Sequence, residues 1–200
     1  MYETSHHLTE ICETDQARAQ EYAMLAALLA RSPDSEMLRR LAALSPDTSL
    51  LGRAHQALAQ AAARTSADDA RREYFDLFSG LGDGGLLPYA SHYVEGALYG
   101  RPLARLRKTL DRLGVERAEG CLDPEDHAAT LCAVMAGLAG GEIAAPVATH
   151  QKFFEQQLAP WIGRFFADLE KSAAASFYAR VATVGRTFIE IEITACGLGS

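Results

Sequence analysis

Apolar residues recur at spacings of three and four along most of this 200-residue chain, the pattern of helices with one buried face. The first such segment follows Thr14 and carries apolar side chains at Tyr22, Leu25 and Leu29. Short breaks that contain proline, serine and aspartate separate it from the segments that follow. The pattern predicts an all-α protein, a compact bundle of about eight to ten helices.

One stretch near the end of the chain allows a second interpretation. Residues 188–193 alternate between apolar and acidic or polar side chains, as in a half-buried strand. The same residues continue a helical stripe that begins at Tyr178, and the chain offers no partner strand. We therefore predict that this stretch is helical.

Two connections interrupt the helical pattern. Residues 79–87 contain four glycines, each of which costs about 1 kcal/mol relative to alanine inside a helix, so a loop is predicted there. Residues 114–122 are polar and contain glycine. We expect one domain over residues 1–200, with a hinge near 114–122 between lobes at 15–113 and 123–194.

A helix start is predicted directly after the second connection. Asp123 is a suitable cap, Pro124 suits the first helical position, and Asp126 can complete a capping box. His127 then begins an apolar stripe, where a histidine is more often a packing residue than a ligand. For Asp126, a capping role and a binding role remain equally open.

Charge and composition exclude several classes of protein. The net charge is -7, from 19 basic and 26 acidic residues, so nucleic acid is not expected as the main ligand. The chain shows neither a signal-peptide pattern nor a run of about 20 apolar residues, so we expect a soluble, cytoplasmic protein without stable membrane insertion. Its four cysteines form no CxxC pair and are expected to be reduced: Cys12, Cys121, Cys132 and Cys196.

No motif predicts catalysis or a bound metal. The candidates Cys121, His127, Cys132 and His150 do not have zinc-site spacing, and no cysteine lies in a nucleophile turn. The glycine run at 80–85 resembles a phosphate loop but lacks Gly-Lys-Ser/Thr and a preceding strand. We therefore expect no catalytic residue, metal or cofactor, and keep a weak nucleotide hydrolase as an alternative.

Aromatic and apolar residues on both sides of the glycine loop are candidates for peptide binding. Before the loop they lie on one helix face, and after it they follow within a few residues. Such residues either form a groove for an apolar peptide or fill the core. The set comprises Tyr74, Leu77, Phe78, Pro88, Tyr89, Ser91 and Tyr93.

The order of these motifs resembles the TorD/DmsD/NarJ family of redox-enzyme maturation chaperones. The segment 73–78 (Glu-Tyr-Phe-Asp-Leu-Phe), the segment 88–95 (Pro-Tyr-Ala-Ser-His-Tyr-Val-Glu) and the segment 124–127 (Pro-Glu-Asp-His) match its signatures in order. The resemblance extends over residues 15–194. The chain has Tyr89 where the family often has tryptophan, and a longer glycine loop.

The resemblance implies an all-helical cytoplasmic chaperone, able to form homodimers that are sometimes domain-swapped. Its partner would be the twin-arginine signal peptide of an apo-molybdoenzyme, whose export it delays while molybdopterin guanine dinucleotide is inserted into the client. A NarJ-like assembly factor for a membrane-bound nitrate reductase is the alternative. The peptide-binding residues that the resemblance implies are Tyr74, Leu77, Phe78, Pro88, Tyr89, Ser91, Asp126 and His127.

Charge suggests how such a leader would be oriented. A twin-arginine signal joins a basic stretch to an apolar one, and Glu95, Glu125 and Asp126 are acidic residues close to the aromatic set. We expect these carboxylates to meet the arginines while the aromatic face takes the apolar part.

Overall fold

The computed structural model describes residues 13–45, 47–79, 85–117 and 123–197. These residues form ten α-helices, one short π-helix and no strand, which confirms the all-α prediction. In chain order the helices are α1 (Glu13–Ala30), α2 (Ser35–Ala42), α3 (Leu50–Ala62), α4 (Ala67–Phe78), α5 (Ala90–Glu95), α6 (Gly100–Leu113), α7 (Ala128–Ala139), α8 (Val147–Phe153), the π-helix η1 (Phe154–Leu158), α9 (Ile162–Lys171) and α10 (Phe177–Ala195).

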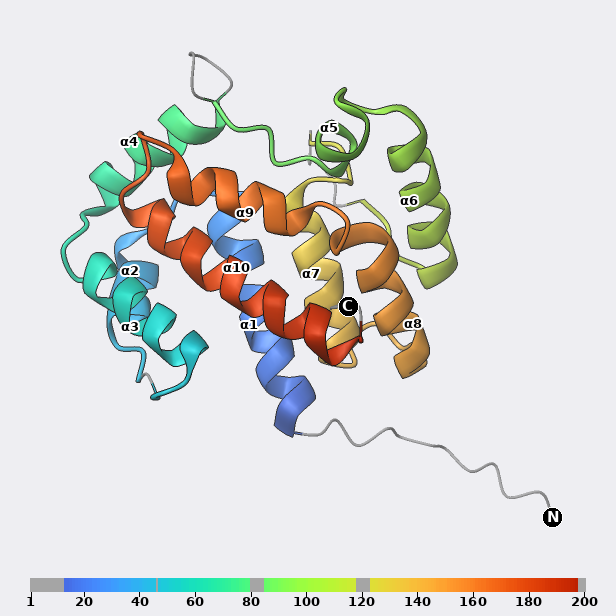
Figure 1. The fold of residues 1–200 in the computed structure, drawn as a ribbon, viewed down its shortest axis with the longest axis horizontal. Coiled ribbons are helices and arrows are strands. Elements are labelled where there is room, and N and C mark those ends of the chain that lie inside the picture. Colours follow the sequence, from blue (N-terminus) through green and yellow to red (C-terminus); the bar gives the residue numbers. More distant parts are fainter. Residues whose placement is uncertain (1–12, 46, 80–84, 118–122, 198–200) are drawn as a thin grey trace.

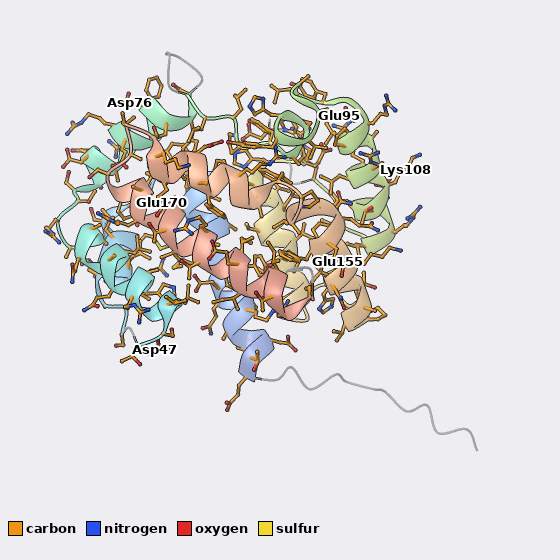
Figure 2. All side chains as sticks on the ribbon, in the orientation of Figure 1. Asp47, Asp76, Glu95, Lys108, Glu155 and Glu170 are labelled. Carbon is orange, nitrogen blue, oxygen red and sulfur yellow. The ribbon has the colours of Figure 1, made fainter. Side chains whose placement is uncertain are left out.

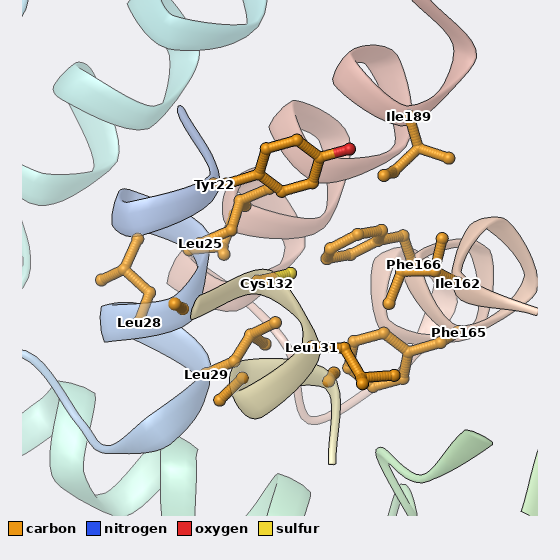
Figure 3. Close-up of a cluster of buried hydrophobic side chains, with 14 of the residues drawn as sticks. Tyr22, Leu25, Leu28, Leu29, Leu131, Cys132, Ile162, Phe165, Phe166 and Ile189 are labelled. Carbon is orange, nitrogen blue, oxygen red and sulfur yellow. The ribbon is translucent and has the colours of Figure 1, made fainter. Parts of the chain in front are cut away.

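The centre of the molecule is built from helices that are distant in the chain. Helix α1 packs along α7, and α10 packs between α9 and α3 (Figure 1). Side chains from α1, α7, α9 and α10 meet in one buried cluster that includes Leu25, Leu131, Phe165, Phe166 and Ile189 (Figure 3). Helices from the 15–113 and 123–194 segments therefore share this core. The predicted hinge falls partly on residues 118–122, which lie outside the described residues.

A buried ion pair fixes α1 against α10. Arg18 donates two hydrogen bonds of 2.8 Å to the carboxylate of Glu192, and the Tyr22 hydroxyl donates a third, also 2.8 Å long. Glu192 is only 2% exposed, so its negative charge is compensated within the core by these donors. Residues 188–193 form the last part of α10, which confirms the prediction that this stretch is helical.

Helices α9 and α10 approach closely because one of them has a glycine at the contact. A Cβ added to Gly185 would lie 2.4 Å from ring atoms of Phe166, far inside van der Waals contact. The ring of Phe166 is fully buried, so it has no free space into which to move. Among the described helices, none has the length and apolar character needed to cross a membrane.

Two glycine substitutions on these helices should change stability in opposite directions. Gly185→Ala should lower the free energy of unfolding by about 1–3 kcal/mol, because the methyl group overpacks the Phe166 contact. Gly163→Ala on α9 meets open space and should raise it by up to about 1 kcal/mol through helix propensity. Urea denaturation measures both, and equal stabilisation by the two variants would contradict this packing.

Candidate functional site

Two segments that matched the family signatures lie side by side. The amide of Ala90 donates to the carbonyl of Asp126 at 3.0 Å, and the amide of Ala128 donates to the carbonyl of Pro88 at 2.8 Å. These two bonds form an antiparallel bridge between Tyr89 and His127. The bridge brings together residues more than 30 positions apart and sets where α5 and α7 begin.

The carboxylate of Asp126 reinforces this bridge from inside. It is 1% exposed, and its Oδ2 accepts a hydrogen bond of 2.8 Å from the amide of Ser91. The Ser91 hydroxyl, also buried, accepts from the amide of Tyr99 at 3.0 Å. Among the described residues, Asp126 Oδ1 is a buried side-chain oxygen without a hydrogen-bond partner.

The predicted helix start at Asp123 and Pro124 is wrong. Helix α7 begins at Ala128, and its cap is His127, whose Nδ1 accepts from the amide of Ala129 at 3.1 Å. Asp126 cannot complete a capping box because its carboxylate is used across the bridge by Ser91. The Pro-Glu-Asp-His segment is therefore a turn before the helix.

Tyr89, which is half-buried, and His127, which is buried, face each other across the bridge. Their rings meet edge to face, with centroids 5.1 Å apart, and the Tyr89 hydroxyl donates to Asp123 Oδ1 at 2.9 Å. Burial, and then the hydrogen bond to Asp123, raises the pKa of Tyr89. Burial lowers the pKa of His127, so its imidazole is neutral near pH 7.

The aromatic residues before the glycine loop pack on α10. The rings of Tyr74 and Phe78 lie 5.7 and 5.6 Å from that of Tyr178, and the Tyr74 hydroxyl donates to the carbonyl of Leu29. Leu77 is fully buried and belongs to the core. Burial, with a smaller effect of the Asp123 charge, raises the pKa of Tyr74.

Tyr93 and Glu95 both belong to α5 but, being two residues apart, they do not share a helix face. The Tyr93 hydroxyl donates to Asp168 at 3.1 Å, and its ring lies 5.7 Å from that of Trp161. Glu95 ends α5 and is exposed (Figure 2). The three predicted arginine acceptors therefore do not share one surface.

An apolar cavity with an acidic rim lies beside the bridge, and we call it the acidic cavity. It has a volume of about 700 Å³ and lies between α1, α6 and α7. Its wall is largely alanine, and four carboxylates and two guanidinium groups line it as well. The alanines are Ala26, Ala27, Ala30, Ala129 and Ala133, and the charged residues are Arg107, Asp111, Glu116, Arg117, Asp123 and Glu125.

Two arginines of the chain itself contact this rim. Arg107 holds Glu125 with hydrogen bonds of 2.9 to 3.1 Å from two of its nitrogens, and this contact lowers the pKa of Glu125. Arg117 donates to the carbonyl of Asp123 at 2.8 Å. The rim is therefore a surface that binds guanidinium groups within the chain itself.

The sequence patterns did not reveal the acidic cavity. Much of its apolar wall consists of alanines spaced three and four apart on α1 and α7, but alanine is so frequent in this chain that such spacing does not single out a site. Asp123 is predicted from the sequence only as a helix cap. The common position of the lining residues depends on how α1, α6 and α7 pack, which local spacing does not specify.

The described thiol and imidazole groups do not assemble into a metal centre. Within the described residues, no three of the histidine, cysteine and acidic side chains gather as metal ligands would. Burial raises the pKa of the Cys132 thiol to about 12, so this cysteine stays protonated. Cys12 and Cys121 lie outside the described residues.

The comparisons with known proteins agree with the bridge and its motifs. A family model described as the nitrate reductase delta subunit matches residues 46–167. The chain therefore belongs to this family, the TorD/NarJ group of helical proteins. The matched region contains α4, the Pro88–Ala90 segment and α7.

Individual relatives are more distant. The chain is 28% identical over 127 residues to the chaperone protein TorD of Vibrio cholerae serotype O1, covering 59% of this chain and 58% of that protein. It is 25% identical over 130 residues to TorD of Vibrio atlanticus, covering 60% of each. The chain thus spans only about three fifths of the length of these relatives.

The fold itself has a solved counterpart. A redox enzyme maturation protein from Archaeoglobus fulgidus superposes with a TM-score of 0.58 at 22% identity, covering 86% of this chain and 93% of that one. At this identity the likeness concerns the fold alone.

Two histidines should titrate on opposite sides of the ordinary histidine pKa of 6.5. The hydrogen bond from His55 to Glu21 raises the pKa of His55, whereas burial lowers that of His127. The His55 contribution to stability is full below pH 6.5 and is lost as pH rises through its folded pKa. The His127 contribution is full above pH 6.5 and is lost as pH falls toward its folded pKa.

Imidazole NMR titration, assigned with His55→Gln and His127→Gln, measures both values. His127→Gln should also weaken the loss of thermal stability below pH 6.5. A His127 pKa at or above 6.5 would contradict the buried, neutral cap.

Proposed function

We propose that this protein is a redox-enzyme maturation chaperone that binds an arginine-bearing, apolar leader segment of its client in the acidic cavity. The observation that carries the proposal is the cavity itself, an alanine-walled hollow of about 700 Å³ with Asp123 and Glu125 on its rim. It lies next to the bridge formed by two family motifs. The relatives from the two Vibrio species are named chaperones, which supports the same class of function.

The chemistry of the leader follows from this cavity. Its apolar part would pack on the alanines of α1 and α7, and its arginines would bind Glu125 and the neighbouring carboxylates. We propose a twin-arginine leader of an apo-molybdoenzyme, held in the cytoplasm while its molybdopterin cofactor is inserted. In this proposal the chain binds without catalysing a reaction, and no cofactor belongs to it.

The aromatic residues would extend the contact beyond the cavity. Tyr89, Tyr74 and Phe78 are partly exposed, and Tyr89 contacts Asp123 on the rim of the cavity. The apolar stretch of a leader could continue along these rings. Pro88, Ser91, Asp126 and His127 are buried in the bridge, so we assign them the role of positioning Tyr89. Leu77 supports α4 from the core.

A second candidate remains within the same class. The family model is described as the nitrate reductase delta subunit, which favours an assembly factor for a nitrate reductase whose N-terminus need not carry two arginines. Nucleotide hydrolysis has weaker support, because the glycine run at 80–85 lacks the Gly-Lys-Ser/Thr of a phosphate loop. Residues 80–84 of that run lie outside the described residues. Competition between a twin-arginine leader and a nitrate reductase N-terminal peptide separates the two binding candidates.

Tyr89 is the aromatic position to test first. Tyr89→Ala should weaken binding of a twin-arginine leader peptide by about thirtyfold, equivalent to about 2 kcal/mol, because it removes a rigid aromatic contact. Tyr89→Phe keeps the ring and should lose much less. Titration calorimetry measures the affinities, and thermal melts control for folding.

Phe75→Ala is the matched control, because Phe75 is exposed on α4 beside Tyr74. Unchanged affinity in folded Tyr89→Ala protein, with a loss in Phe75→Ala, would place the leader on another face of α4.

The pair Arg107 and Glu125 offers a test with two opposite outcomes. Glu125→Gln should weaken leader binding by about fivefold to tenfold and flatten its dependence on salt, because a charge-assisted contact is lost. Arg107→Gln should strengthen binding, because it removes the internal guanidinium that competes for Glu125. Arg101→Gln, an exposed charge-matched change on the same helix, should have little effect. If Glu125→Gln and Arg107→Gln both weakened leader binding, the result would contradict the proposal that a leader arginine replaces Arg107 on Glu125.

A further inference from the structure

A second cavity lies on the other side of α6, and we call it the basic cavity. It has a volume of about 520 Å³ and is bounded by α5, α6, η1 and the start of α9. Helix α6 lies at the edge of the molecule (Figure 1). The cavity is open to solvent, because several of its lining residues on α5 and α6 are exposed. Arg107 and Asp111 of α6 line the acidic cavity, whereas Arg105, Lys108 and Arg112 line the basic one.

The three cations form a stripe on successive turns of α6. Arg105, Lys108 and Arg112 are three and four residues apart, all are exposed, and Lys108 extends away from the helix (Figure 2). In the part of the chain that the structure describes, no carboxylate lies within 4.0 Å of them. The chain as a whole has a net charge of -7, but these three cations make the surface beside this cavity positive. A positive surface favours an anionic partner.

The floor of the basic cavity is apolar rather than charged. Leu106, Pro102 and Trp161 are buried residues that line it, and Val94 adds an apolar side chain that is 45% exposed. Gln156 and Gln157 supply amide groups at its edge. Such a floor takes an aliphatic side chain, which a purely ionic ligand does not have.

The position of Asp126 favours a polypeptide over a compact anion as the ligand of the basic cavity. It lines the basic cavity, is 1% exposed, and its Oδ1 is the buried oxygen that has no hydrogen-bond partner among the described residues. A phosphate in the cavity would approach this carboxylate and be repelled by it. A peptide can keep its own carboxylates at the cationic mouth while an N–H or hydroxyl group donates to Oδ1.

The geometry points to a second docking surface on this protein, which binds an acidic segment with apolar side chains from a protein partner. Carboxylates of the segment pair with Arg105, Lys108 and Arg112, an aliphatic side chain packs against Leu106 and Trp161, and a donor of the segment satisfies Asp126. The charge of this surface is opposite to that of the acidic cavity, so the two surfaces select different segments. The inference does not depend on the proposed binding of a leader.

The chain contains a built-in reporter for this surface. Trp161 is its single tryptophan and lies in the lining of the basic cavity. The probe is a 12-residue peptide in which glutamates flank two leucines, and its counterpart has lysine in place of each glutamate. Full-length protein is titrated with each peptide at low salt, and Trp161 fluorescence and peptide anisotropy are recorded together.

The glutamate peptide should change Trp161 fluorescence and bind with an affinity that falls as salt rises, whereas the lysine peptide should bind at least tenfold more weakly. Binding of the glutamate peptide should be weaker by about fivefold or more in each of three variants, Arg105→Glu, Lys108→Glu and Arg112→Glu. Arg40→Glu is the charge-matched control, because Arg40 is exposed on α2, away from the basic cavity. All four changes are on exposed side chains, so thermal melts should match the parent protein.

Three results would overturn the inference. The first is that the glutamate peptide does not bind. The second is that the three charge-reversal variants bind it as well as the Arg40→Glu control does. The third is that the glutamate and lysine peptides bind with equal affinity. Phosphatidylglycerol vesicles are tested in parallel, and binding of vesicles without the peptide would assign the basic stripe to a lipid surface instead. A twin-arginine leader is titrated into the same variants to distinguish this surface from the proposed leader site. Charge reversal at Arg105, Lys108 or Arg112 should not weaken binding of the leader.

Discussion

The candidate site depends on the backbone bridge between Pro88–Ala90 and Asp126–Ala128. Two amide hydrogen bonds join these segments, and the buried carboxylate of Asp126 adds a third from the amide of Ser91. These bonds fix the start of α5 relative to the start of α7. The bridge thereby places Tyr89 over His127 and brings Asp123 within reach of the Tyr89 hydroxyl.

The bridge also explains why adjacent acidic residues have different surroundings. Glu125 and Asp126 are neighbours in the chain, yet Glu125 lines the acidic cavity and Asp126 lines the basic one. In the turn before α7, successive side chains point to opposite sides of the strand-like segment. Helix α6 stands between the two cavities, with Arg107 directed to one and Arg105 to the other. One turn and one helix thus divide the charged residues of this region into two separate surfaces.

The sequence predicted the fold far better than the site. The apolar stripes of α1 and α10 predicted long amphipathic helices, because side chains three and four residues apart face the same core. The order of the Tyr-Phe, Pro-Tyr and Pro-Glu-Asp-His segments predicted the family, which the comparisons confirmed. The start of α7 was placed four residues too early, because Asp123 and Pro124 have the local chemistry of a helix start while Asp126 is engaged across the bridge. The cavities could not be predicted, since their walls combine residues from helices that meet only in the folded chain.

The contact between Arg107 and Glu125 has a consequence for the choice between arginine and lysine. Arg107 presents two nitrogens of its planar guanidinium to the Glu125 carboxylate. A lysine ammonium offers a point charge on a flexible stem and cannot reproduce this two-point geometry. In the proposed binding of a leader, an incoming guanidinium can therefore replace both contacts of Arg107, whereas an ammonium can replace only one. The proposed binding mode thus favours arginine over lysine at this carboxylate.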